Sequence, residues 1–172
     1  RLCRDWSSDV CSSDLVPLSD ELALARSYIA IEAIRLGDRL RVHWVCDPAV
    51  DATLVPPLLL QPLLENAVRY GVEPLEGGAD VNVVVAREGN YLVLTVRNPL
   101  PAGDAAVVAA EDEARPDGGH DRRRAGSRDG NRMALANIKE RLLLHFDAEA
   151  ELRTAMEGGE HITRVRLPLR SE

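Results

Sequence analysis

The segment from Pro57 to Gly71 constrains the fold of this chain more than any other, because its two sides differ in chemistry. At about 100° per residue, a helix over this segment gathers its apolar residues on one side: Leu60, Leu63, Leu64, Ala67 and Val68. The opposite side carries polar residues: Glu65, Asn66, Arg69 and Tyr70. Such a helix buries its apolar side against a second layer. We therefore predict a helix over residues 56–72, begun by two prolines whose missing N–H groups cost nothing there.

Alternating apolar residues predict that second layer. The alternation typical of strands occurs at residues 39–46, 80–87, 91–96, 149–155 and 162–169. Apolar residues at three- and four-residue spacing predict two further helices, over 17–36 and 131–146. The expected fold class is therefore α/β (α+β), a two-layer sandwich of helices on a mixed, mainly antiparallel sheet.

Two stretches lack any periodicity and suggest the domain organisation. Residues 1–15 repeat Ser-Ser-Asp, and we expect a non-native or disordered leader there. Residues 99–130 combine prolines, glycines, an acidic cluster and a basic cluster, and a stretch of this length inside a domain predicts a long mobile lid. The leader is followed by an expected linker helix (16–40) and a single domain (41–172) that contains the lid.

The bulk composition narrows the class of function. Hydrophobic residues make up 45% of the chain and aromatic residues 3%, so the core must be aliphatic. A formal net charge of -7 disfavours general binding to nucleic acid, whose phosphates it repels. The three cysteines match neither a disulfide framework nor a metal-binding spacing. No apolar run approaches the ~20 residues that a membrane helix needs, so any membrane attachment must lie in other segments.

The polar side of the predicted helix suits a magnesium nucleotide. Mg²⁺ prefers hard oxygen ligands and keeps several waters, so the amide oxygen of Asn66 can complete its coordination beside phosphates. Arg69 can meet phosphate oxygens, and Glu65 can act as a general base. The alternative is a solvated Glu65–Arg69 pair at i, i+4 spacing. Spacing alone favours this alternative.

The order of several motifs resembles one known family. The segment from Gln61 to Gly71, QPLLENAVRYG, resembles the N box of the GHKL (Bergerat-fold) ATPases and kinases, and more narrowly of LytS/AlgZ-type sensor histidine kinases. Residues 17–22, 28–32 and 35–40 resemble the lead-in of that branch. Residues 130–142 resemble its last nucleotide-box helix, and residues 159–168 its closing strand. The likeness extends over nearly everything from Val16 onward.

The resemblance implies a set of site residues. Asn66 would hold the Mg²⁺ bound to ATP, and Glu65 would be the catalytic carboxylate. The remaining nucleotide contacts would come from Arg69, Tyr70, Asn98, Gly130, Arg132 and Asn137. Two departures from the family pattern stand out. Asn98 replaces the usual adenine-binding Asp, and Arg132 and Ala134 stand where glycines are usual.

The function that the resemblance implies is that of a protein histidine kinase fragment. The domain would transfer the γ-phosphoryl group of ATP to a histidine that the chain lacks, since His43, His120, His145 and His161 lack a phosphoacceptor's neighbours. Its partners would be the phosphoacceptor helix of its own or a partner protomer in a homodimer, and a response regulator. The expected location is the cytoplasmic side of a bacterial inner-membrane protein.

Two other functions remain open at this stage. One is a degenerate, non-catalytic GHKL module that regulates a partner by protein–protein contact, as the changed nucleotide boxes would allow. The other is a GHKL ATPase outside signalling, against which the lead-in over residues 17–40 speaks.

Overall fold

The computed structural model describes residues 15–100 and 122–170, and the side chains of residues 122–133 lie outside that description. Its helices are α1 (Leu18–Leu36), α2 (Leu60–Asn66) and α4 (Arg122–Phe146), with a π-helical segment η3 (Ala67–Val72) directly after α2. Its strands are β1 (Val16–Pro17), β2 (Leu40–Cys46), β3 (Leu54–Val55), β4 (Ala79–Glu88), β5 (Tyr91–Pro99), β6 (Glu151–Glu157) and β7 (Glu160–Pro168). Short 3₁₀ turns are η1 (Gly37–Arg39), η2 (Pro48–Val50) and η4 (Asp147–Glu149).

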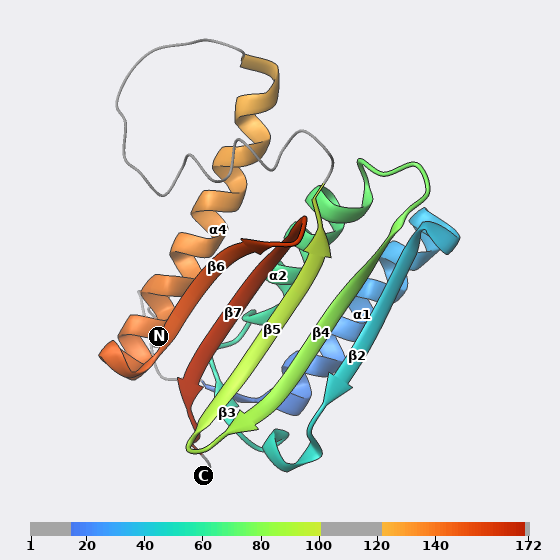
Figure 1. Ribbon diagram of the computed structural model, residues 1–172. Helices are drawn as coiled ribbons and strands as arrows, with labels where there is room; N and C mark the ends of the chain where they lie inside the picture. The colour runs from blue at the N-terminus through green and yellow to red at the C-terminus, as the bar shows by residue number, and fades with distance from the viewer. Residues whose placement is uncertain (1–14, 101–121, 171–172) are drawn as a thin grey trace, which may run out of the picture.

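The main sheet has the strand order β2-β4-β5-β7-β6. Only β2 and β4 pair in parallel within it, and the other neighbours are antiparallel. Strands β2 and β4 are joined by a long connection that contains α2, as parallel neighbours require. Figure 1 shows α1, α2 and α4 on one face of this sheet and the other face without a helix. The predicted two-layer fold with a mixed, mainly antiparallel sheet is confirmed.

Aliphatic side chains fill the space between the two layers. Along β4, Val81, Val83 and Val85 are buried while their neighbours are more exposed, as the alternation predicted. The predicted apolar side of α2 is buried against them, with Leu60 and Leu64 fully covered. Burial of this apolar area is the dominant favourable term in folding.

Helix α1 belongs to the same core. Its buried residues Leu18, Leu22, Ala25 and Ile29 join a single cluster with residues of α2 and the sheet. The segment predicted as a linker helix therefore packs as part of the sandwich. Its role as a connection to a phosphoacceptor region stays a prediction.

Glycines close both hairpins of the sheet. Gly89 joins β4 to β5 with φ of 62°, and Gly158 and Gly159 join β6 to β7 with φ of 59° and 82°. These left-handed values favour glycine, because a side chain would meet the backbone. The strands predicted at 80–87 and 91–96, and those at 149–155 and 162–169, thus form two antiparallel hairpins, with strand boundaries shifted by a few residues.

Two predicted helix starts are wrong. The helix expected from residue 56 begins at Leu60, because the chain turns at Leu58 with φ of 56° before the helix can form. The helix expected from Asn131 begins at Arg122. Glycines 126 and 130 suggested a loop there, but helix propensity is a weak prior that neighbouring helix formers and the rest of the fold override.

The predicted leader and lid fall largely on residues without a description. Residues 1–14 and 101–121 lie outside it, and His120 with them. The described ends of the predicted lid are regular, since Pro99 completes β5 and residues 122–130 are helical. A mobile lid over the intervening residues stays a prediction.

Candidate nucleotide-binding site

The polar side of α2 faces away from the core, as its sequence predicted. Glu65 and Arg69 are exposed and Asn66 is half-buried, whereas Ala67 and Val68 between them are buried. Within the described part of the chain, the side chains of Asn66 and Arg69 make no hydrogen bond or ion pair. The guanidinium carbon of Arg69 lies 5.9 Å from the ring centroid of Tyr70. An amide and a cation are therefore presented on one helical run, and the part of the chain that the structure describes offers no partner for their polar atoms.

The helix widens immediately after Asn66. Residues Ala67–Val72 form a π-helical segment, and the N–H of Glu73 donates to the carbonyl of Val68 at 2.9 Å, an i to i+5 bond. Such segments are rare and recur at functional sites, because the extra residue redirects the side chains that follow. Here the widened turn places Gly71, one π-helical turn beyond Asn66, against the sheet.

Gly71 lies in close contact with Asn98 at the end of β5. A Cβ at Gly71 would lie 2.5 Å from Nδ2 of Asn98 and 2.7 Å from its Cβ. Carbon atoms normally keep about 3.5–4.0 Å apart. Only glycine therefore lets the Asn98 side chain occupy this place. The contact joins the two sequence motifs that the resemblance assigned to one nucleotide site.

The amide of Asn98 is buried and partly engaged. Its side chain is 3% exposed, and Nδ2 donates to the carbonyl oxygen of Pro99 at 3.0 Å. Within the described residues no donor reaches its Oδ1. That oxygen is the natural acceptor for a ligand amino group. His161 is the β7 partner of Asn98 in the strand register, and burial lowers the pKa of its imidazole, which favours the neutral ring beside this site.

Glu65 lies on the side of α2 that faces α1. Nε2 of Gln61 donates to Oε1 of Glu65 at 2.8 Å, one helical turn away. Burial, and after it the charges of Glu32 and Glu65, raise the pKa of Tyr28 on α1 to about 12.

The turn before α2 is held by two residues that the sequence reading missed. Glu21 of α1 is buried and accepts hydrogen bonds from the N–H groups of residues 58, 59 and 60. Arg141 of α4 donates to the carbonyl oxygens of Pro57 and Leu58. One signal could have revealed Glu21, since it lies on the apolar side of its helix, beside Leu18, Leu22 and Ala25.

The predicted contacts from the second nucleotide box are only partly described. Asn137 is exposed on α4, and no hydrogen bond within the described residues joins it to α2. Gly130 and Arg132 lie in the first half of α4, where side chains are outside the description. The structure therefore brings Gly71 against Asn98, and it places Asn66, Arg69 and Tyr70 on the helical run that carries Gly71. The roles of Gly130, Arg132 and Asn137 remain predictions.

The donor set fits a magnesium nucleotide better than a protein-held metal. The described ranges 15–100 and 122–170 contain no group of three or more His, Cys, Asp or Glu side chains that could hold an ion. Mg²⁺ commonly takes one or two protein ligands and completes its shell with water and phosphate oxygens. A single amide oxygen from Asn66 is consistent with that mode of binding.

Comparison with known proteins identifies relatives of this chain in sequence and in fold. No family model matches the chain. The chain is 29% identical over 170 residues to the sensor histidine kinase YpdA of Escherichia coli, covering 97% of this chain and 28% of YpdA. It is 27% identical over 140 residues to the sensor protein LytS of Staphylococcus haemolyticus, covering 81% of this chain and 22% of LytS. Among solved structures, the catalytic domain of histidine kinase ThkA superposes with a TM-score of 0.60 at 10% identity, covering 92% of this chain and 98% of that domain.

The chain is similar over most of its length to sensor histidine kinases, and its fold is that of a histidine kinase catalytic domain. The structural likeness shows the fold, and the relatives that are similar in sequence include LytS. The domain spans less than a third of the length of the curated relatives it matches. No helix among its described residues is both long enough and apolar enough to cross a membrane.

Proposed function

We propose that this domain binds magnesium ATP and transfers its γ-phosphoryl group to a histidine outside the chain. The observation that carries the proposal is the contact of Gly71 with Asn98, one π-helical turn from Asn66. This contact links a buried amide that has an acceptor oxygen to the helical run that carries a half-buried amide, Asn66, and an exposed cation, Arg69, whose polar atoms have no partner in the described residues. A nucleotide needs both features, one for its base and one for its phosphates.

Each residue has a distinct role in this proposal. The Oδ1 of Asn98 accepts a hydrogen bond from the adenine amino group, as a neutral acceptor in place of a carboxylate. Asn66 contributes an oxygen to Mg²⁺, which would neutralise phosphate charge. Arg69 binds phosphate oxygens, and Tyr70 extends the same polar side. Glu65 orients the attacking group or accepts its proton. Positioning and charge neutralisation would supply most of the catalysis, as in phosphoryl transfer generally.

The wider assignments follow from the whole length of the relatives and are proposals too. YpdA and LytS are sensor proteins several times longer than this chain. We propose that the phosphoryl group passes to a phosphoacceptor histidine of the same or a partner protomer, and then to a response regulator. The domain would lie on the cytoplasmic side of a bacterial inner-membrane protein, with residues 16–40 leading from the dimerisation region and residues 99–130 acting as the ATP lid.

The alternative of a degenerate regulatory module is not favoured. Its motivation was the replacement of the usual Asp by Asn98 and of glycines by Arg132 and Ala134. Asn98 nevertheless keeps an acceptor oxygen, and the polar side of the N box helix is intact. The relatives that match most of this chain are sensor histidine kinases.

Calorimetric titration with ATP tests the proposal. The chain is titrated with and without Mg²⁺, together with Asn66→Ala and, as a control, Asn82→Ala, which changes an asparagine on the open face of the sheet. The proposal predicts binding that strengthens with Mg²⁺ in the chain and in the Asn82 variant. The magnesium dependence should vanish in the Asn66 variant. A folded chain that binds no ATP at millimolar concentration would refute the proposed activity and favour the regulatory module.

A further inference from the structure

The turn that precedes the N box helix lies between two charged side chains from distant parts of the chain. Glu21 comes from α1 and Arg141 from α4, and both contact residues 57–60. The carboxylate takes the N–H groups of this turn, while the guanidinium takes its carbonyl groups. The turn is thus held through both kinds of backbone polar group.

Glu21 performs the capping that the turn's own sequence does not supply. Its Oε1 accepts from the N–H of Leu58 at 2.6 Å, and its Oε2 accepts from those of Leu59 and Leu60 at 2.8 and 3.2 Å. The first N–H groups of a helix need external acceptors, and Leu59 at the N-cap has no side-chain oxygen. A carboxylate at this end also complements the helix dipole. At 3% exposure Glu21 has little access to water, so these bonds are its main compensation for burial.

Arg141 holds the same turn from the side of α4. Its Nη2 donates to the carbonyl of Leu58 at 3.1 Å, and its Nη1 donates to the carbonyl of Pro57. Leu142, the next residue, is buried in the core and fixes this part of α4. The contact therefore ties the helix that follows the predicted lid to the start of the N box helix.

The backbone conformation of Leu58 shows that this turn requires stabilising contacts. Its φ of 56° is left-handed, a region that costs a residue with a Cβ. Its side chain is 48% exposed, so packing does not impose this conformation. The backbone hydrogen bonds to Glu21 and Arg141 on either side are the contacts that do.

We infer that Glu21 and Arg141 are positioning residues, which fix the N box helix so that Asn66 and Gly71 stand correctly against Asn98. The inference rests on the proposed function. Helix α2 is short and leads into the wider π-helical segment, so a shift at its start moves Asn66 directly. Through this turn, a displacement of α1 or of α4 changes the nucleotide site without any contact to the nucleotide.

A first experiment needs no nucleotide. Backbone and side-chain amide NMR spectra are compared for the chain, Glu21→Gln and Asp20→Asn, an exposed neighbouring carboxylate that matches the charge change. A glutamine offers one oxygen to three donors, so the amide signals of Leu58, Leu59 and Leu60 should shift and exchange faster. Those of Asn66 and Gly71 should shift with them. Shifts confined to residues 58–60 would overturn the inference, because the helix would then keep its place.

A second experiment measures the consequence for the site. Affinity for magnesium ATP should fall about tenfold in Glu21→Gln and in Arg141→Gln, and stay unchanged in Asp20→Asn and Lys139→Gln. The double variant should lose less than the product of the two single losses, because both residues act on one turn. A lowered melting temperature with unchanged affinity would assign both residues a purely structural role and overturn the inference. If the unaltered chain binds no ATP, the proposed function fails, and the nucleotide-free spectra still decide whether Glu21 positions Asn66.

Discussion

Replacing Gly71 by alanine perturbs the contact on which the proposed site depends. The added Cβ would lie 2.5 Å from Nδ2, 2.7 Å from Cβ and 2.9 Å from Cγ of Asn98. Separations of about 3.5–4.0 Å are normal, so Asn98 must withdraw by about 1 Å. Its Cβ is attached to the backbone of β5, so a rotamer change cannot remove the clash. The end of β5 or the π-helical segment has to move.

The free energy of unfolding should fall by about 1 kcal/mol in this variant. Overpacking in a well-packed region costs about 1–3 kcal/mol. Alanine in place of glycine in a helical segment returns about 1 kcal/mol. For a domain of this size, the melting temperature should drop by about 2–4 °C. Affinity for magnesium ATP should fall about tenfold or more, because a displacement near 1 Å moves the acceptor oxygen Oδ1 of Asn98 and changes its position relative to Asn66.

Thermal melting and calorimetric titration with ATP measure the two effects. Gly77→Ala is the matched control, because a Cβ there meets nothing within 4 Å. We expect the control to bind ATP like the unaltered chain. A Gly71→Ala chain with unchanged affinity and melting temperature would refute the claim that the contact with Asn98 shapes the site.

Two further predictions concern the stability of the folded domain. Leu58→Gly should raise the free energy of unfolding by about 1 kcal/mol, because glycine adopts the left-handed φ of this position without the steric cost of a Cβ. Leu24→Gly within α1 is the control and should lower the free energy of unfolding by about 1 kcal/mol. Equal effects of the two substitutions in denaturant titrations would contradict this prediction. Hydrogen bonds from Arg41 and then His43 lower the pKa of Asp80 to about 2, below its value in an unfolded chain. The pair therefore stabilises the folded state above about pH 4 and loses that effect as the pH falls toward 2. The difference in melting temperature between the chain and Asp80→Asn should be small, because Asp80 and its partners are exposed, and it should shrink over that range. A difference that is as large at pH 2 as at pH 7 would contradict this prediction.

The sequence predicted the parts of the fold that repeat a simple period. Alternation identified β4 through Val81, Val83 and Val85, and the two-sided pattern of the N box helix placed Leu60 and Asn66 correctly. These predictions succeed because an element with one buried face must repeat its apolar residues at the period of its secondary structure. The fold class followed from the order of such elements.

The parts that failed depend on contacts between distant residues. Nothing local to the three leucines at 58–60 indicates a left-handed turn, since Glu21 and Arg141 hold it from other helices. The close contact of Gly71 with Asn98 likewise requires the π-helical segment. The spacing of the apolar residues in the sequence does not reveal the extra residue in that turn. In the candidate site, the roles of the residues that the sequence suggested stay predictions, and the structure adds the contact of Gly71 with Asn98.

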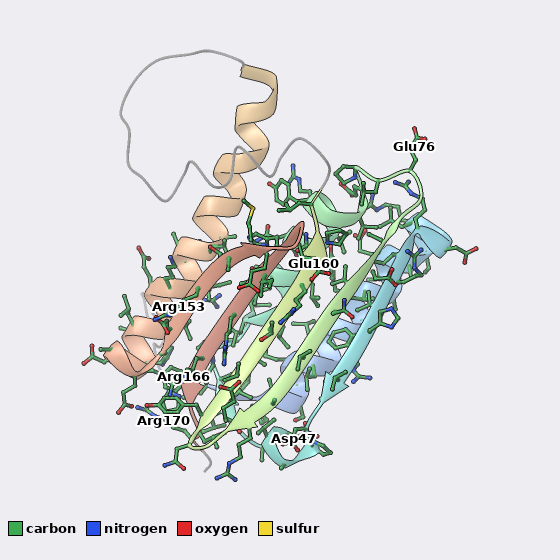
Figure 2. The ribbon with its side chains drawn as sticks, viewed as in Figure 1. Asp47, Glu76, Arg153, Glu160, Arg166 and Arg170 are labelled. Carbon is green, nitrogen blue, oxygen red and sulfur yellow. The ribbon has the colours of Figure 1, made fainter. Side chains whose placement is uncertain are left out.

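Paramagnetic broadening by Mn²⁺ in place of Mg²⁺ tests the central claim most directly, because it reports where the metal of the bound nucleotide lies. Amide NMR signals are recorded with ATP while Mn²⁺ is added in small amounts. The account predicts that the Asn66 side-chain amide and the backbone signals of residues 66–71 broaden first, and that Asn66→Ala abolishes the effect. Figure 2 shows Arg153 and Arg166 on the open face of the sheet, a second place among the described residues where cationic side chains gather and attract phosphates. Broadening that begins there, with the signals of residues 66–71 unaffected, would contradict the account.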